Sequence, residues 1–217
     1  MPGGDWAMSK NKGPRDDRWY LPLMAPNTKG EKFAWLDPTL LYINGEAFHA
    51  LLDDLTADLQ GVAADVVAGL DAMGFVPGSA LAVRPGVGFL PNRKAGKLCV
   101  DADRVSFSNY SGRTQDMEMR IPAFAPGTQV LIADQWVETG ATMDGAIRLI
   151  ERQDGVVAGM AAIAIEDNAV TAGYRQRLVC ASAAVPGSRW QAECDAQALS
   201  NFARCKAHLA FPARRNG

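Results

Sequence analysis

The chain has 217 residues, of which 48% are hydrophobic and 21% are charged, so it is long enough to bury the core of one domain. Its formal net charge of −2 gives no basic field that would attract nucleic acid or an anionic membrane. No apolar run reaches the roughly 18 residues that span a bilayer, and the N-terminus lacks the apolar core of a signal peptide. We therefore expect a soluble cytoplasmic protein with no nucleic-acid partner and no membrane partner.

Metal-ligating residue types are sparse in this chain. His49 and His208 are its two histidines, which excludes a multi-histidine metal site. The four cysteines are scattered without the paired short spacings of a zinc site or the density of a disulfide scaffold. We expect reduced thiols and no metal held by protein ligands alone.

The chain begins with a polar, turn-rich segment, residues 1–18, that we expect to be disordered. A proline-broken apolar segment with Phe33 and Trp35 follows it. Residues 46–60 then carry apolar side chains on one face and predict a packing helix. We expect one main domain over residues 19–190 and a C-terminal helical extension over 191–217.

The next apolar run, residues 65–70, predicts a buried strand. It leads into a small-residue turn that contains Asp71, Ala72 and Met73, and then into a helix that runs to Arg84. Two such strand-turn-helix units side by side form a ligand crevice at the carboxyl edge of a parallel sheet.

A basic turn follows the strand predicted over residues 87–91. Arg93, Lys94 and Lys97 place three cations within five residues. Such a run is either a solvated face or a set of partners for phosphate, and residue types alone leave both open. Residues 99–112 are polar and predict irregular structure, whereas the alternation over 113–120 predicts an exposed strand.

The stretch from Val130 to Gln153 organises the rest of the sequence. Residues 130–133 are apolar without alternation, as expected for a parallel strand buried on both faces, and helical spacing resumes at Met143. Asp134 and a run of small and hydroxyl residues lie between them. Backbone amides at a helix start have no intrahelical partner and bind anions, so the run predicts a phosphate cradle formed by Thr139, Gly140, Ala141 and Thr142. An ordinary strand-loop-helix unit with Thr as N-cap is the alternative.

Two further strands are predicted beyond this stretch, over residues 156–165 and 177–184, and the pattern over 191–209 predicts an amphipathic helix. We assign no chemical role to that last helix, which either caps the sheet or forms a subunit contact.

The central stretch resembles the phosphoribosyl pyrophosphate (PRPP) motif of type I phosphoribosyltransferases, in which a hydrophobic strand and two acids precede Thr-Gly-x-Thr. Asp134 matches the first acid, and Gln135 stands in place of the second. Glu138 adds a carboxylate beside the phosphate loop. The segment with Gly69 to Phe75 and the basic turn resemble the pyrophosphate-binding parts of adenine phosphoribosyltransferases, with Met73 where that family has an arginine.

The resemblance covers roughly residues 33–166 and also reaches a flap that closes over the sugar. Asn109 and Tyr110 match the Glu-Tyr pair of that flap, so Tyr110 is preserved and the acid is lost. Because the acid is thought to assist proton transfer, its loss leaves the acceptor base open.

The resemblance implies an α/β fold, with a central mostly parallel sheet flanked by helices, a small N-terminal hood and a flexible flap. It implies transfer of the phosphoribosyl group from PRPP to a purine-like base, with Mg²⁺ bound mainly through PRPP and a homodimer as the assembly. Asp134 and Gln135 would hold the ribose hydroxyls, and Phe33 either stacks on the base or belongs to the core. Asn109, Tyr110, Trp35, Glu138 and the turn at Asp71 to Met73 complete the expected site.

Two rival functions remain open at this point. One is a non-catalytic regulatory protein that binds PRPP or a nucleotide with the same fold. The other is an α/β domain that binds an unrelated phosphorylated ligand. Met73, Asn109 and Gln135 remove three ionised groups expected at the site, which favours a slower enzyme or an unusual heterocycle as acceptor.

Overall fold

A computed structural model describes residues 19–20, 23–24, 37–108 and 114–184 of the protein. Within them a seven-stranded sheet has the order β3-β4-β2-β1-β5-β6-β7. The strands run over Val66–Leu70 (β1), Gly88–Lys94 (β2), Ala102–Ser108 (β3), Thr114–Arg120 (β4), Gln129–Val137 (β5), Val156–Ile165 (β6) and Val179–Ala184 (β7). The pairs β2–β1, β1–β5, β5–β6 and β6–β7 are parallel. In contrast, β4 pairs antiparallel with both β2 and β3.

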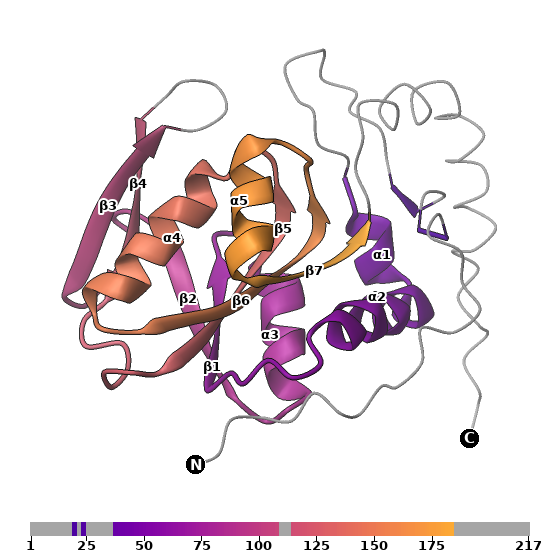
Figure 1. The fold of residues 1–217 in the computed structure, drawn as a ribbon, viewed down its shortest axis with the longest axis horizontal. Coiled ribbons are helices and arrows are strands. Elements are labelled where there is room, and N and C mark those ends of the chain that lie inside the picture. Colours follow the sequence, from indigo (N-terminus) through magenta and orange to yellow (C-terminus); the bar gives the residue numbers. More distant parts are fainter. Residues whose placement is uncertain (1–18, 21–22, 25–36, 109–113, 185–217) are drawn as a thin grey trace.

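Helices cover both faces of this sheet (Figure 1). One face packs against Thr39–Ile43 (α1), Gly45–Asp58 (α2) and Phe75–Val83 (α3), and the other against Ala141–Arg152 (α4) and Ala169–Arg177 (α5). Each face has its own cluster of buried apolar side chains. The α/β fold expected from the sequence, with a mostly parallel sheet flanked by helices, is confirmed.

Local sequence signals explain where the helices begin. Asn44 caps α2 because its side-chain oxygen accepts from the amides of Glu46 and Ala47, both at 3.1 Å. Asn168 caps α5 and forms a reciprocal pair with Thr171. In α2, Leu51 and Leu55 are fully buried on the apolar face that the spacing predicts.

Four details of the predicted secondary structure were wrong. β3 forms where irregular structure was expected, because it completes an antiparallel hairpin with β4. β4 is less exposed than expected, since its central residues 117–119 are buried. β2 and β5 extend past the predicted ends at residues 91 and 133, and neither α1 nor α5 was predicted.

Several predicted features lie outside the described residues: the segment 1–18, the helix at 191–209, and Phe33, Trp35, Asn109 and Tyr110. Among the helices of the described part of the chain, none has the length and apolar character needed to cross a membrane.

Candidate functional site

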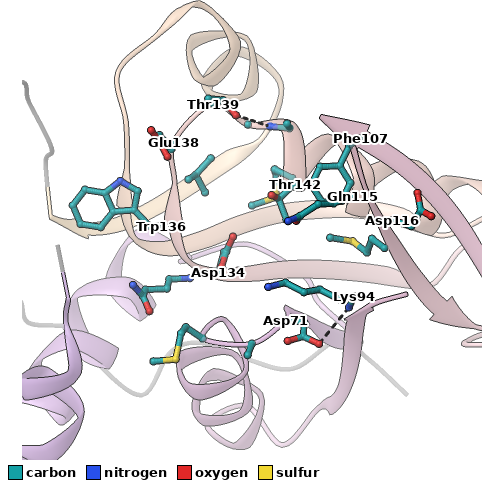
Figure 2. A pocket seen from close by; sticks show the side chains of 18 residues that line it. Asp71, Lys94, Phe107, Gln115, Asp116, Asp134, Trp136, Glu138, Thr139 and Thr142 are labelled. Atoms are coloured by element: carbon teal, nitrogen blue, oxygen red, sulfur yellow. Dashed lines mark hydrogen bonds between the residues drawn. The ribbon is translucent and has the colours of Figure 1, made fainter. Parts of the chain in front are cut away.

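A cavity of about 400 Å³ opens at the carboxyl ends of β1 and β5 (Figure 2). Its walls come from the turn at residues 71–73, the end of β5 at 134–137, the loop and helix start at 138–143, and residues 115–117 of β4. Phe107 of β3 and Lys94 of β2 complete the described lining. Parallel strands bring these chain-distant segments together because their carboxyl ends meet at one edge of the sheet.

The loop between β5 and α4 has the geometry of an anion cradle. Gly140 has φ +83°, a conformation that L side chains rarely adopt, and a Cβ there would meet Val170 Cγ1 at 2.7 Å. Tyr174 of α5 donates toward the Gly140 carbonyl at 3.0 Å and toward Asp144 Oδ1 at 2.6 Å. A glycine is therefore required here, and α5 holds the loop at the start of α4, where backbone amides have no intrahelical partner.

Asp134 lies in the last part of β5, with its carboxyl at the floor of the cavity. Its Oδ1 accepts from the Gln135 amide at 2.7 Å. The side chain keeps some exposure through the cavity but is otherwise surrounded by protein. This desolvation outweighs the hydrogen bond and raises the pKa of Asp134 to about 7. The group can thus change its protonation near neutral pH.

Gln135 also lines the cavity, but its environment differs. The residue is 6% exposed, and its Oε1 atom is buried without a hydrogen-bond partner among the described residues. A buried, unpaired carbonyl oxygen is costly, so this atom stands ready for a partner that a ligand supplies.

The turn after β1 is closed by an ion pair. Arg93 Nε lies 2.9 Å from Asp71 Oδ2, and the Lys94 amide donates to the same oxygen at 3.3 Å. The Arg93 guanidinium also lies 5.8 Å from the centroid of the Phe75 ring. Gly74 lets this turn approach β5, because a Cβ there would meet the Ala133 carbonyl oxygen at 2.7 Å.

The described lining of the cavity is more acidic than basic. It holds the carboxylates of Asp71, Asp116, Asp134 and Glu138, with Lys94 as the cation. Asp71 is neutralised by Arg93, and Lys94 extends from β2 toward the Asp134 side of the cavity (Figure 2). A phosphorylated ligand therefore needs additional positive charge in order to bind here.

A second acidic feature lies beside the phosphate cradle. Trp136 donates from Nε1 to Glu166 Oε1 at 2.9 Å. Glu138 projects from the loop near this pair, and burial, with a smaller contribution from the charge of Glu166, raises the pKa of Glu138. No cation among the described residues pairs with Glu138.

The basic turn after β2 is held by a buried acid. Glu118 Oε1 accepts from the Lys97 and Leu98 amides, each at 2.7 Å, and Arg104 Nε lies 3.1 Å from its other oxygen. Burial alone would raise the pKa of Glu118, but these donors outweigh it and lower the pKa to about 2. Glu118 therefore holds the turn in place through the turn's backbone amides.

The structure brings together most, but not all, of the residues predicted for the site. The predicted residues that line this cavity come from the two loops, the end of β5 and the basic turn. They are Asp71, Ala72, Met73, Lys94, Asp134, Gln135, Glu138, Thr139, Gly140, Ala141 and Thr142. Arg93 and Lys97 are not among the lining residues. Their phosphate-binding role, like that of the residues outside the described part, stays a prediction.

Sequence reasoning missed seven of the residues that line the cavity: Phe107, Gln115, Asp116, Met117, Trp136, Val137 and Met143. The first four come from the β3–β4 hairpin, half of which was predicted as irregular. Alternation over residues 102–108 was the available signal. Trp136 was missed because the strand was expected to end at residue 133.

No family model matches the chain. The sequence is 39% identical over 125 residues to the adenine phosphoribosyltransferase of Brevibacillus brevis, covering 58% of this chain and 73% of that protein. It is 42% identical over 129 residues to the adenine phosphoribosyltransferase of Chlorobium phaeovibrioides, covering 58% and 72%.

Solved structures agree with these relatives. The adenine phosphoribosyltransferase of Rhodothermus marinus superposes with a TM-score of 0.65 at 29% identity, over 75% of this chain and 93% of that one. The Saccharomyces cerevisiae enzyme, in complex with an imino-altritol bisphosphate and adenine, gives a TM-score of 0.62 at 27% identity, over 73% and 90%.

Proposed function

Since this chain belongs to the adenine phosphoribosyltransferase family, we propose that its cavity transfers the 5-phosphoribosyl group of PRPP to an adenine-like or less usual purine-like base. The enzyme is a PRPP-dependent pentosyltransferase of purine salvage. One observation carries the proposal. The glycine-centred loop at the start of α4 and the Asp134 carboxyl share one cavity, which provides a phosphate cradle beside a group that binds hydroxyls.

The reaction exchanges one bond at the anomeric carbon of the ribose. The lone pair of a ring nitrogen of the base forms a bond to C1′ while the bond from C1′ to the pyrophosphate oxygen breaks. Pyrophosphate leaves with that electron pair, and the proton of the ring nitrogen passes to a pyrophosphate oxygen or to solvent. Positive charge develops on the ribose and negative charge on the leaving group, so the site must stabilise both.

The residues of the chain divide these tasks. Backbone amides and hydroxyls of the loop 139–142 bind the 5′-phosphate. The Asp134 carboxylate accepts hydrogen bonds from the ribose hydroxyls and faces the developing positive charge. Lys94 supplies a cation for the pyrophosphate. The indole of Trp136 offers a flat apolar face to the base, a role also predicted for Phe33.

Magnesium fits the donor set of this cavity. Its carboxylates are hard oxygen ligands, yet the described residues contain no group of three acidic or histidine side chains placed to hold a metal. A Mg²⁺ ion that enters with PRPP would thus be bound mainly by the ligand, and the Asp134 carboxylate could contribute an oxygen to it. The ion supplies positive charge to the pyrophosphate.

Pyrophosphate release from PRPP and Mg²⁺ tests the proposal. A panel of purines, pyrimidines and other heterocycles serves as acceptors, and Asp134→Asn serves as the blank. We expect base-dependent release that the blank lacks. If PRPP binds by calorimetry but no base gives release above the blank, the transferase assignment falls and a regulatory PRPP-binding protein replaces it.

The assembly needs a separate measurement. We infer a homodimer from the family to which the chain belongs. Light scattering of the purified chain should give twice the 23.2 kDa monomer mass, and a monomeric mass at assay concentrations would refute the dimer.

A further inference from the structure

Transfer to a purine leaves one proton to be removed. In the five-membered ring of a purine, one nitrogen carries an in-plane lone pair and the other carries a hydrogen. When the lone pair bonds to C1′ of the ribose, the ring gains positive charge, and it becomes neutral again once the N–H bond breaks. A side-chain base that takes this proton accelerates such a step by about a hundred- to ten-thousandfold. The step thus calls for a carboxylate that has no other partner and lies on the acceptor side of the cavity.

Three of the four carboxylates in the described lining already have a partner or a proposed role. Asp71 forms an ion pair with Arg93 at 2.9 Å. Asp116, in the β3–β4 hairpin, accepts from the Ser106 hydroxyl at 2.6 Å. Asp134 lies at the floor of the cavity, where it is proposed to hold the ribose hydroxyls. The fourth carboxylate remains for the base.

This fourth carboxylate belongs to Glu138, in the loop between β5 and α4. Its backbone is held in place, because Asn168, the N-cap of α5, donates from Nδ2 to the Glu138 carbonyl at 2.7 Å. Its side chain lines the cavity, and among the described residues no donor or cation pairs with the carboxylate. A fixed backbone with an unpaired carboxylate is the arrangement that a positioned base requires.

Glu138 also lies on the side of the cavity that suits the acceptor. In the view of Figure 2, Asp134 lies between Lys94 on one side and the Glu138 carboxyl and the Trp136 indole on the other. Displacement at one carbon aligns the entering group opposite to the leaving group. In the proposed complex Lys94 faces the pyrophosphate and Asp134 faces the ribose, so the purine enters against Trp136 with Glu138 at its edge.

The surroundings of Glu138 strengthen it as a base. Burial, with a smaller contribution from the charge of Glu166, raises its pKa. Glu166 is itself held by the Trp136 N–H at 2.9 Å. A carboxylate with a raised pKa binds a proton more tightly than an exposed carboxylate does, so proton transfer from a weakly acidic ring nitrogen becomes less unfavourable.

We propose that Glu138 is the general base of the transfer. As one ring nitrogen of the purine bonds to C1′ and the bond from C1′ to pyrophosphate breaks, the Glu138 carboxylate takes the proton of the other ring nitrogen. The resulting carboxylic acid then passes that proton to the departed pyrophosphate or to solvent, which restores the carboxylate. This inference rests on the proposed transferase function, and it makes Glu138 a catalytic residue.

The first test compares a purine with its 8-aza analogue, such as adenine with 8-azaadenine or guanine with 8-azaguanine, according to the acceptor that the panel identifies. Nitrogen at that ring position makes the ring N–H much more acidic, so the analogue needs less help from a base. In single turnovers with saturating PRPP and Mg²⁺, Glu138→Gln should slow transfer to the purine about a hundredfold and transfer to the analogue less than about tenfold. Similar slowing of both, or no slowing of either, would overturn the proposal.

The analogue also separates proton transfer from simple recognition. It keeps the polar groups of the six-membered ring, so a Glu138 side chain that only accepts a hydrogen bond from those groups would matter equally for both acceptors. A change of at least about tenfold in the ratio of the two rates is therefore expected only of a base.

Two further variants complete the comparison. Asp134→Asn removes the other cavity carboxyl whose pKa is raised, and it should slow both acceptors to a similar extent because its proposed role is on the ribose. Asp167→Asn removes the same charge from a side chain that is 87% exposed, and it should leave both rates unchanged. If the analogue restored transfer in Asp134→Asn but not in Glu138→Gln, Asp134 would be the base and the proposal would fall.

The outcomes distinguish this inference from the proposed function. If the unmodified chain releases pyrophosphate with a purine, the transferase function stands whatever the variants do, and the ratio of purine to analogue rates decides the role of Glu138. Saturating PRPP ensures that a slower rate in Glu138→Gln reflects the chemical step rather than lost binding of PRPP. If no purine supports release, both proposals fall together.

Discussion

At the scale of single residues, the Asp134 carboxyl, which is proposed to bind ribose hydroxyls, lies where burial disfavours its ionised form. Its pKa of about 7 lies above the ordinary value near 4 because burial disfavours the ionised form. Above pH 7 the folded protein therefore holds a desolvated charge, which the ribose hydroxyls and Mg²⁺ of the proposed complex would offset. The ionised Asp134 carboxylate thus lowers the stability of the unliganded protein at a position where the proposed function needs it.

Asp134→Asn should stabilise the unliganded protein while it abolishes transfer. The raised pKa means that ionised Asp134 opposes folding, an effect that is absent below the unfolded pKa near 4 and complete above about 7. The free energy of unfolding of the variant should therefore exceed that of the unmodified chain by about 1–2 kcal/mol at pH 8. Urea titrations at pH 4, 6 and 8 would measure it, and a difference that shrinks with rising pH would contradict the assignment.

Glu138 places a carboxylate in the cavity lining beside the loop that is proposed to bind phosphate. Glu138→Gln should lower KM for PRPP roughly three- to tenfold at pH 8, because a carboxylate beside the 5′-phosphate repels it. Since the pKa of Glu138 is raised, acidification protonates it and should reduce the difference between the two proteins. Asp167→Asn removes the same charge from a side chain that is 87% exposed and should leave this KM unchanged. Equal values of KM for PRPP in all three proteins at pH 8 would refute the repulsion.

At the scale of elements, Glu118 joins β4 to the basic turn that follows β2. Its carboxylate is fully buried and is held by two amides at 2.7 Å and by Arg104. The β3–β4 hairpin is also tied to α4, because Arg148 donates to the Ser106 carbonyl and Arg152 pairs with Asp103. The β3–β4 hairpin is therefore held to the basic turn through Glu118 and to α4 through Arg148 and Arg152.

Glu118→Gln should destabilise the protein by about 2 kcal/mol at pH 7, since charge-assisted hydrogen bonds are replaced by neutral ones. The lowered pKa of Glu118 implies that its contribution is complete above its ordinary pKa near 4.5 and is lost as pH falls toward 2. Denaturant titrations from pH 7 to pH 3 should therefore converge for the two proteins. Glu151→Gln, at an exposed position, is the control, and parallel curves for Glu118→Gln would disprove the assignment.

Elements with strong local patterns were predicted well from the sequence. The apolar run of β5, the spacing of α4 and the small residues between them indicated the phosphate loop, whose glycine indeed has a positive φ. β3 and α5 were missed because tertiary contacts define them. β3 is fixed by its pairing with β4, and α5 depends on a cap at Asn168 and on the buried Tyr174.

Charge partners were the least predictable part of the site. Arg93 was expected to reach pyrophosphate, yet it pairs with Asp71, which comes 22 residues earlier in the chain. Gln135 was expected beside Asp134 on the ribose; both residues line the cavity, and that role stays a prediction. The pairing of Arg93 with Asp71 cannot be read from spacing, because it depends on how adjacent strands are brought into register.

At the scale of the whole molecule, the net charge is −2, and the described part of the cavity lining holds more carboxylates than cations. PRPP is itself strongly anionic. Chelation of Mg²⁺ with excess EDTA should therefore weaken PRPP binding at least tenfold, because the protein alone supplies too little positive charge. Calorimetric titration of PRPP with Mg²⁺ and with EDTA would measure this, and equal affinities would mean that the lining binds PRPP without the ion.

The bond between Trp136 and Glu166 has a practical consequence for spectroscopy. The indole lines the cavity while its N–H is held by a carboxylate 2.9 Å away, so its emission reports on both the polarity of the cavity and the charge of its neighbour. Ligand entry displaces water from the ring and should shift the fluorescence maximum without any added dye. Trp136→Phe identifies this signal against the other four tryptophans of the chain, and occupancy can then be followed by stopped-flow on the time scale of a single turnover.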